Sequence, residues 1–307
     1  MELLFLEPVF KEAIWGGTKL RDSFGYDIPS DTTGECWAIS AHKNGDCKIA
    51  GGRYDGKYLS QLWEEEPELF GNYPGSQFPL LIKIIDAKND LSIQVHPDDE
   101  TAKERHNAYG KTEMWYMVDA EKDASLVLGF NQEIDKNTYL QALHQNKLMD
   151  LLNVQKVKKG ESFFIPAGLV HAIGKGCFIA EIQQTSDITY RIYDYNRKDA
   201  NGNTRELHTD LATDVIDYSY HPQHKVNYTP HDNQSVQLVK CPYFTTNLLV
   251  FDRDIEKEYV RLDSFVIYMC LQGKFTITTG ECDPVLVNKG ETVLVPACFK
   301  NLTLYPD

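Results

Sequence analysis

Short runs of valine, isoleucine, leucine, phenylalanine and tyrosine recur along the chain, and each run ends at glycine, proline, asparagine or aspartate. Such runs between turn-forming residues are typical of β-strands. We expect strands within 79–86, 90–96, 113–119, 124–130, 162–168, 177–184, 264–270, 274–280 and 291–297. Many short strands in one chain predict an all-β fold, either a sandwich or a barrel.

Helical periodicity is confined to a few segments between these runs. Helical patterning is found within 58–70, 98–106 and 133–153, which predicts helical insertions on a β scaffold. The polar stretch 217–235 has little periodicity and is the predicted linker.

The sequence also contains an internal repeat. "KKGESFFIPAG" at 158–168 and "NKGETVLVPAC" at 288–298 share Lys-Gly-Glu-Ser/Thr and Pro-Ala. A weaker match sets Tyr116 over Tyr268 and so places Phe265 opposite Glu113. We therefore expect two copies of one β module, spanning 1–235 and 236–307.

One histidine follows the first copy of this repeat. Gly160, Pro166, Gly168 and His171 fill the pattern G-x5-P-x-G-x2-H, which resembles the second motif of the cupin superfamily. Cupins are small double-sheet β-barrels, or jelly rolls, in which this histidine points inward and binds a metal. The resemblance implies two such barrels in tandem. Taken alone, a histidine in a core strand is more often a buried residue without a ligand role.

Further candidate ligands lie upstream of His171. Side chains alternate along a strand, so Gln94 and His96 share one face and Lys111 and Glu113 share another. Each pair alone also fits a half-buried strand or an exposed ion pair. Together His96, Glu113 and His171 supply two imidazoles and a carboxylate, a ligand set that leaves positions for water and substrate.

Charge and hydropathy exclude some partners. The chain has 31 basic and 45 acidic residues, a net charge of −14, and no run of Lys and Arg that tracks a phosphate backbone, so we expect no nucleic-acid partner. No apolar run approaches the roughly 20 residues of a membrane span, and the first residues lack a signal-peptide pattern. We expect a cytoplasmic protein without a membrane partner, and the sequence leaves its oligomeric state open.

Most of the chain resembles the type I phosphomannose isomerases, especially their short bacterial form. The motifs that carry the resemblance are "GECWAIS" at 34–40, "QVHPDDE" at 94–100, "KTEMWY" at 111–116, "IPAGLVHAIGKG" at 165–176 and "SDITYRIYDYNR" at 186–197. The resemblance implies a metal-dependent aldose–ketose isomerase that interconverts mannose 6-phosphate and fructose 6-phosphate through a cis-enediol. It implies one zinc ion per chain, bound by His96, Glu113 and His171, with Gln94 as a possible fourth ligand.

The resemblance and the residue chemistry together suggest catalytic groups. The D-x3-R motif of the family maps onto Asp187 and Arg191, and strand alternation places both on one face. Lys111 is suited to the substrate phosphate or to proton transfer. Long family members often read H-K-P-E where this chain has Gly110 to Glu113, so any role of that first histidine does not carry over.

Two other functions fit the same ligand set. One is a non-haem Fe(II) oxygenase, which also uses two histidines and a carboxylate. The other is a cupin that binds a sugar phosphate without catalysis. Gln94, Lys111, Asp187 and Arg191 favour the isomerase. In the second module Asn301 stands where His171 stands in the first, so we expect that module to bind no metal.

Overall fold

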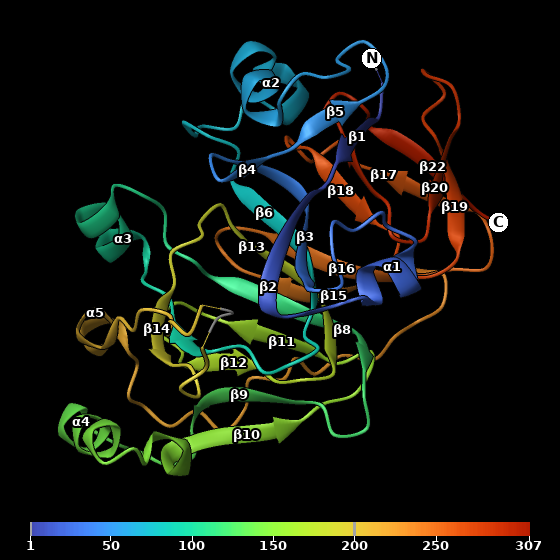
Figure 1. Cartoon of the computed structure of the whole chain (residues 1–307). Coiled ribbons are helices and arrows are strands. Elements are labelled where there is room, and N and C mark those ends of the chain that lie inside the picture. The colour runs from blue at the N-terminus through green and yellow to red at the C-terminus, as the bar shows by residue number, and fades with distance from the viewer. Residues whose placement is uncertain (1, 199–200) are drawn as a thin grey trace.

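A computed structural model describes residues 2–198 and 201–307 and shows a strand-rich chain with short helices (Figure 1). The helices are α1 (Lys19–Phe24), α2 (Leu59–Glu65), η1 (Pro67–Phe70), α3 (Asp99–His106), α4 (Lys136–His144), η2 (Leu148–Leu151) and α5 (Thr209–Val215), where η marks a 3₁₀ helix. The predicted helical insertions at 58–70, 98–106 and 133–153 are confirmed. Helices α1 and α5 were not predicted.

Two antiparallel sheets contain most of the strands that precede residue 200. The first, the β8 sheet, contains β2 (Val9–Gly17), β3 (Thr33–His42), β4 (Gly45–Asp46), β6 (Leu80–Asp86), β8 (Glu113–Ala120), β11 (Ser162–Ile165) and β13 (Cys177–Gln184). The second, the β7 sheet, contains β7 (Ile93–Val95), β9 (Ser125–Phe130), β10 (Leu152–Lys156), β12 (His171–Ile173) and β14 (Tyr190–Tyr193).

A hydrophobic core fills the space between these two sheets. Trp115 and Ile179 of the β8 sheet pack in one buried cluster with Leu126, Leu128 and Ile173 of the β7 sheet. Burial of large side chains from both sheets supplies the main driving force for this packing. The core holds the sheets face to face and positions the strand ends described below.

A second pair of sheets is formed largely by the C-terminal residues. The β21 sheet contains β1 (Leu4–Glu7), β5 (Lys48–Ala50), β18 (Val266–Met269) and β21 (Thr292–Val295). The β19 sheet contains β17 (Ile255–Glu258), β19 (Lys274–Thr278), β20 (Val285–Asn288) and β22 (Asn301–Pro306). Strands β15 (Gln234–Lys240) and β16 (Thr245–Val250) form a separate hairpin.

The N-terminal strand belongs to this C-terminal pair. In Figure 1 the dark blue β1 lies beside the orange strands, and Leu4 pairs with Leu294 of β21. The strand-dominated fold with helical insertions is thus confirmed. Among the described residues each sheet is an open path of strands and none closes on itself. The module boundary between residues 235 and 236 stays a prediction.

Both copies of the repeat contain the same glycine turn, at Gly160 and at Gly290. Gly160 and Gly290 adopt positive φ of 82° and 90°, which favours glycine. Gly160 N–H donates to the carbonyl of Met117 at 2.8 Å, and Gly290 N–H donates to that of Cys270 at 2.7 Å.

Strand pairing next to this turn shows that the weaker match, which set Tyr116 over Tyr268, is wrong by one residue. Ser162 pairs with Tyr116, whereas the equivalent Thr292 pairs with Met269 and not with Tyr268. The position equivalent to Glu113 is therefore Val266 and not Phe265. The predicted loss of a ligand at this position is unaffected, because an isopropyl group cannot bind a metal.

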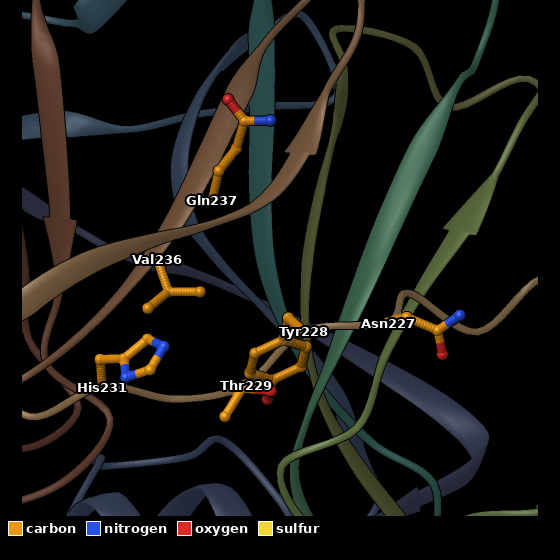
Figure 2. A pocket seen from close by; sticks show the side chains of 6 residues that line it. All are labelled: Asn227, Tyr228, Thr229, His231, Val236 and Gln237. Carbon is orange, nitrogen blue, oxygen red and sulfur yellow. The ribbon is translucent and has the colours of Figure 1, made fainter.

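The predicted linker runs along the edge of β11. Val226 N–H donates to Ser162 O at 2.8 Å, and Phe164 N–H donates to His224 O at 3.2 Å. A pocket of about 560 Å³ lies beside the linker and the start of β15. Figure 2 shows the residues that line it, Asn227, Tyr228, Thr229, His231, Val236 and Gln237. It contains none of the predicted site residues.

None of the helices formed by residues 2–198 and 201–307 combines the length and the apolar character needed to cross a membrane.

Candidate metal centre

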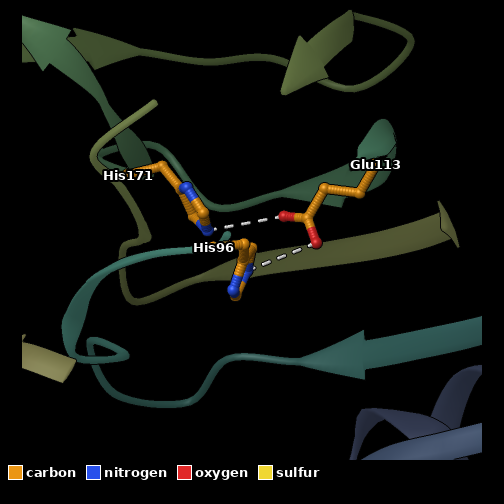
Figure 3. Close-up of side chains that lie close together, drawn as sticks. All are labelled: His96, Glu113 and His171. Carbon is orange, nitrogen blue, oxygen red and sulfur yellow. Dashed lines mark ion pairs between the residues drawn. The ribbon is translucent and has the colours of Figure 1, made fainter. Parts of the chain in front are cut away.

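His96, Glu113 and His171 meet at one end of the first pair of sheets. His96 follows β7 directly, Glu113 is the first residue of β8, and His171 is the first residue of β12. Strand pairing brings His171 opposite Gln94 and so next to the end of β7. One ligand atom from each of the three side chains lies within 4.8 Å of the others, and Figure 3 shows them pointing toward one another.

Both histidines are held so that Nε2 faces the cluster. Nδ1 of His96 lies 2.9 Å from the carbonyl of Ile188, and Nδ1 of His171 lies 2.8 Å from that of Leu169. A carbonyl only accepts, so Nδ1 carries the proton in each ring and the lone pair is on Nε2. This is the tautomer that a metal ligand requires.

Burial keeps these imidazoles neutral. His96 and His171 are each 1% exposed, and burial followed by the charge of Lys111 lowers the pKa of both, to about 4 for His171. Neutral imidazole is the form that binds a metal ion, so neither ring has to lose a proton at neutral pH.

The carboxylate of Glu113 completes the donor set. Its Oε1 lies 3.5 Å from His171 Nε2 and its Oε2 lies 3.6 Å from His96 Nε2. Oε1 is buried without a hydrogen-bond partner among the described residues, which is costly unless a cation satisfies it. Two imidazole nitrogens and a fully buried carboxylate fit a divalent metal ion.

Gln94 reaches the same place from β7. Its amide nitrogen lies 3.4 Å from His171 Nε2, and a rotation of the amide by 180° presents its oxygen instead. Gln94 therefore lies where a fourth ligand is expected.

Lys111 lies among these donor atoms. Its Nζ is 3.0 Å from His96 Nε2 and is hydrogen-bonded to Oε2 of Glu113. The side chain is buried, so its ammonium group interacts with them at low effective dielectric. Lys111 is the cation that directly contacts the ligand set.

Sequence reasoning missed a buried network of charges beside Lys111. Lys83 Nζ lies 3.2 Å from Glu181 Oε1 and 3.5 Å from Glu35 Oε2, and Trp115 Nε1 donates to Glu181 Oε2 at 2.8 Å. Burial opposes ionisation of Glu181, but Lys111 and Lys83 outweigh it and hold its pKa below the ordinary value. The available signal was a charged residue inside each of two apolar runs, Lys83 in "LLIKII" and Glu181 in "CFIAEIQQ".

A cavity of about 310 Å³ opens beside the candidate ligands. Its walls include four predicted site residues, Gln94, Lys111, Asp187 and Arg191, and further residues that include Trp15, Trp37, Glu35, Lys83, Glu181 and Arg205. The cavity thus joins the edge of the candidate metal centre to several charged groups.

Asp187 is held by the turn after β3. Asn44 Nδ2 donates to its Oδ2 at 2.5 Å, and His42 Nε2 lies 3.5 Å from its Oδ1. The expectation that Asp187 and Arg191 share one strand is wrong, since β14 begins at Tyr190 and Asp187 lies in the segment before it. Both residues line the cavity nonetheless.

Arg191 is fixed by the segment that follows β14. Its Nη1 donates to the carbonyl of Glu206 at 2.8 Å, and its backbone N–H donates to His208 Nδ1 at 3.1 Å. Its Nε is buried and has no hydrogen-bond partner among the described residues. This unsatisfied donor therefore belongs to a residue that lines the cavity.

Paired sheets around a buried cluster of two histidines and a glutamate define a protein of the cupin fold with a candidate metal centre. The chain is 43% identical to the mannose-6-phosphate isomerase ManA of Bacillus subtilis over 298 residues, which cover 96% of this chain and 93% of that protein. It is 39% identical to the mannose-6-phosphate isomerase of Streptococcus mutans, over 98% of this chain and 94% of that protein.

A family model and a solved structure agree with these relatives. The model described as "phosphomannose isomerase type I, catalytic domain" matches residues 3–130. The crystal structure of mannose 6-phosphate isomerase from Bacillus subtilis aligns with a TM-score of 0.93 and 38% identity, and it covers 100% of this chain and 97% of that chain. The chain belongs to the type I phosphomannose isomerases.

Proposed function

We propose that this chain is a mannose-6-phosphate isomerase that interconverts mannose 6-phosphate and fructose 6-phosphate through a cis-enediol. The observation that carries the proposal is the cavity, which places Lys111, Asp187 and Arg191 beside the buried cluster of two histidines and a glutamate. Membership of the family indicates which substrate to expect, because both relatives named above are mannose-6-phosphate isomerases.

We propose one zinc ion per chain, held by His96, Glu113 and His171 with Gln94 as the fourth ligand. When bound, a divalent ion supplies Lewis-acid stabilisation of negative charge on the sugar oxygens. The neutral Nε2 atoms and the unsatisfied Oε1 of Glu113 support this ligand set. The second module supplies no equivalent, since Asn301 and Val266 replace His171 and Glu113.

The protein groups in the cavity have separate tasks in this reaction. The isomerisation moves a proton between C1 and C2, so a base must take it from one carbon and return it to the other. Lys111 and Asp187 are the proposed acid–base groups. The buried charges of Lys83 and Glu181 fix the electrostatic surroundings of Lys111.

Arg191 is the proposed hydrogen-bond donor to a substrate oxygen. Its guanidinium remains protonated and offers donors only. The unsatisfied Nε belongs to a residue that lines the cavity, which supports a role in binding substrate over one in structure. A donor at a reacting oxygen stabilises the negative charge that develops there.

The repeat supports a tandem arrangement of two cupin-type double-sheet barrels. The glycine turn is built twice with the same hydrogen bonds, at Gly160 and at Gly290. Each pair of sheets has its own core. We propose that residues 1–235 form the catalytic module and residues 236–307 the metal-free module, with β1 contributed to the latter.

A coupled assay tests the proposed function. Purified protein with bound zinc should convert mannose 6-phosphate to fructose 6-phosphate, and His171→Ala should not. Binding of the sugar phosphate without turnover indicates the non-catalytic cupin. Oxygen consumption that depends on Fe(II), without isomerisation, indicates the oxygenase.

A further inference from the structure

Two arginines in the cavity come from adjacent backbone segments. Arg191 lies on β14, and Arg205 lies between β14 and α5. His208 N–H donates to the carbonyl of Arg191 at 2.7 Å, and Lys198 forms a β-bridge with Thr204. The chain therefore turns back along β14 and brings Arg205 into the wall that Arg191 also lines.

A buried carboxylate fixes the orientation of Arg205. Its Nε donates to Asp194 Oδ2 at 2.8 Å and its Nη2 donates to Asp194 Oδ1 at 2.6 Å. The side chain of Asp194 is 5% exposed. A bidentate pair of this kind sets the plane of the guanidinium, so Arg205 is oriented before any ligand binds.

The wall near Arg205 favours an anion. The Nε of Arg191 has no hydrogen-bond partner among the described residues. Burial, followed by the positive charge of Arg205, lowers the pKa of Arg191. Two guanidinium groups line one cavity in a chain whose net charge is −14, and an anionic group bound beside Arg205 would relieve their repulsion.

We propose that Arg205 binds the phosphate group of the substrate and makes the site specific for phosphorylated sugars. The inference rests on the proposed isomerase function, which supplies a substrate with one anionic group. The hydroxyls of a hexose are neutral, so the phosphate is the part of the substrate that gains most from a fixed guanidinium. Asp194 is then the positioning residue of Arg205.

Arg197 provides a matched control for this proposal. It also pairs with Asp194 and is hydrogen-bonded to the carbonyl of Asp90, but it is not among the residues that line the cavity. Loss of Arg197, like loss of Arg205, removes a positive charge that pairs with Asp194, but it does not remove a group that lines the cavity. It therefore separates phosphate binding from support of the Asp194 network.

The test compares Arg205→Ala, Arg205→Lys and Arg197→Ala with the wild-type protein. Steady-state kinetics with mannose 6-phosphate give kcat and KM, and calorimetry gives the Kd of inorganic phosphate. We expect Arg205→Ala to raise both KM and Kd by about 10- to 100-fold, the range for a lost hydrogen bond to a charged group, with kcat within a few-fold of wild type. The KM and Kd of Arg205→Lys should lie between those of wild type and those of Arg205→Ala, and the KM and Kd of Arg197→Ala should match those of wild type.

Three results would overturn the proposal: an unchanged KM and Kd in Arg205→Ala, an equal rise in Arg197→Ala, or no binding of phosphate by the wild-type protein. Failure of the proposed function has a different signature, because wild-type protein would then bind phosphate through Arg205 but leave mannose 6-phosphate unchanged.

Discussion

The ammonium group of Lys111 lies 3.0 Å from Nε2 of His96, the atom that this histidine presents to the candidate metal centre. Lys111 is also hydrogen-bonded to Glu113. One lysine thus contacts two of the three proposed ligands while it lines the cavity beside them. The ammonium group contacts the same donor atoms that would bind a metal ion. Lys111 is therefore not needed to hold the ion.

Replacement of Lys111 by methionine should separate metal binding from turnover. We expect Lys111→Met to keep one divalent ion per chain, because the substitution removes a positive charge that repels the ion. Turnover should fall by at least about 10²-fold, the usual contribution of a positioned acid or base. Metal content by elemental analysis and kcat from the coupled assay check this, and loss of metal in step with activity would assign Lys111 to the centre itself.

Removal of a proposed ligand should abolish activity and leave the fold intact. His171→Ala or Glu113→Ala removes one of the few strong donors, and such a centre does not retain its ion. The core between the β8 and β7 sheets consists of apolar side chains that do not depend on the ion. Circular dichroism of both variants and of chelator-treated wild-type protein should match the native spectrum. An unfolded metal-free protein would show that the centre is structural.

Arg191→Ala should retain its metal and its thermal stability but lose turnover. Loss of a charge-assisted donor at a reacting oxygen costs on the order of 10² to 10³ in rate, about 3 to 4 kcal/mol. Metal content, melting temperature and kcat measured on one preparation check this expectation. If the remaining folded fraction turns over normally while stability falls, Arg191 is a structural residue.

The contribution of Asp194 to stability should disappear in acid. Burial opposes its ionisation, but Arg205 and Arg197 outweigh burial and lower its pKa. A carboxyl group with a depressed pKa in the folded state stabilises the protein above its unfolded pKa of about 3.9, and that stabilisation is lost as the pH falls through the folded value. Asp194→Asn should therefore lower Tm at pH 7, with a difference that shrinks below about pH 4. A difference independent of pH would contradict this assignment.

Local pattern was sufficient to predict most strands and the three candidate ligands. Each predicted strand run contains a strand in the structure, and alternation correctly placed Gln94 on the face opposite Ile93 and Val95. Leu91 was expected to share a face with Ile93, but it lies before β7 and lines the cavity with Gln94. His96, Glu113 and His171 could be found because each lies in a motif whose spacing has a chemical meaning.

Features that depend on distant pairing could not be predicted in this way. No local pattern indicates that β1 pairs with β21, whose residues lie at the other end of the chain. The register of the repeat was wrong by one residue because tyrosine and methionine occur together in both copies. Lys83, Glu181 and Arg205 come from three separate segments of the chain, so only the folded arrangement shows that they share one cavity.

The most direct test is a titration of metal-free protein with zinc during continuous assay of mannose 6-phosphate isomerisation. We expect negligible turnover without metal and a rise in activity that reaches its plateau at one equivalent of zinc per chain, with His171→Ala inactive throughout. Full activity in protein shown to be metal-free, or a plateau at two equivalents, would contradict it.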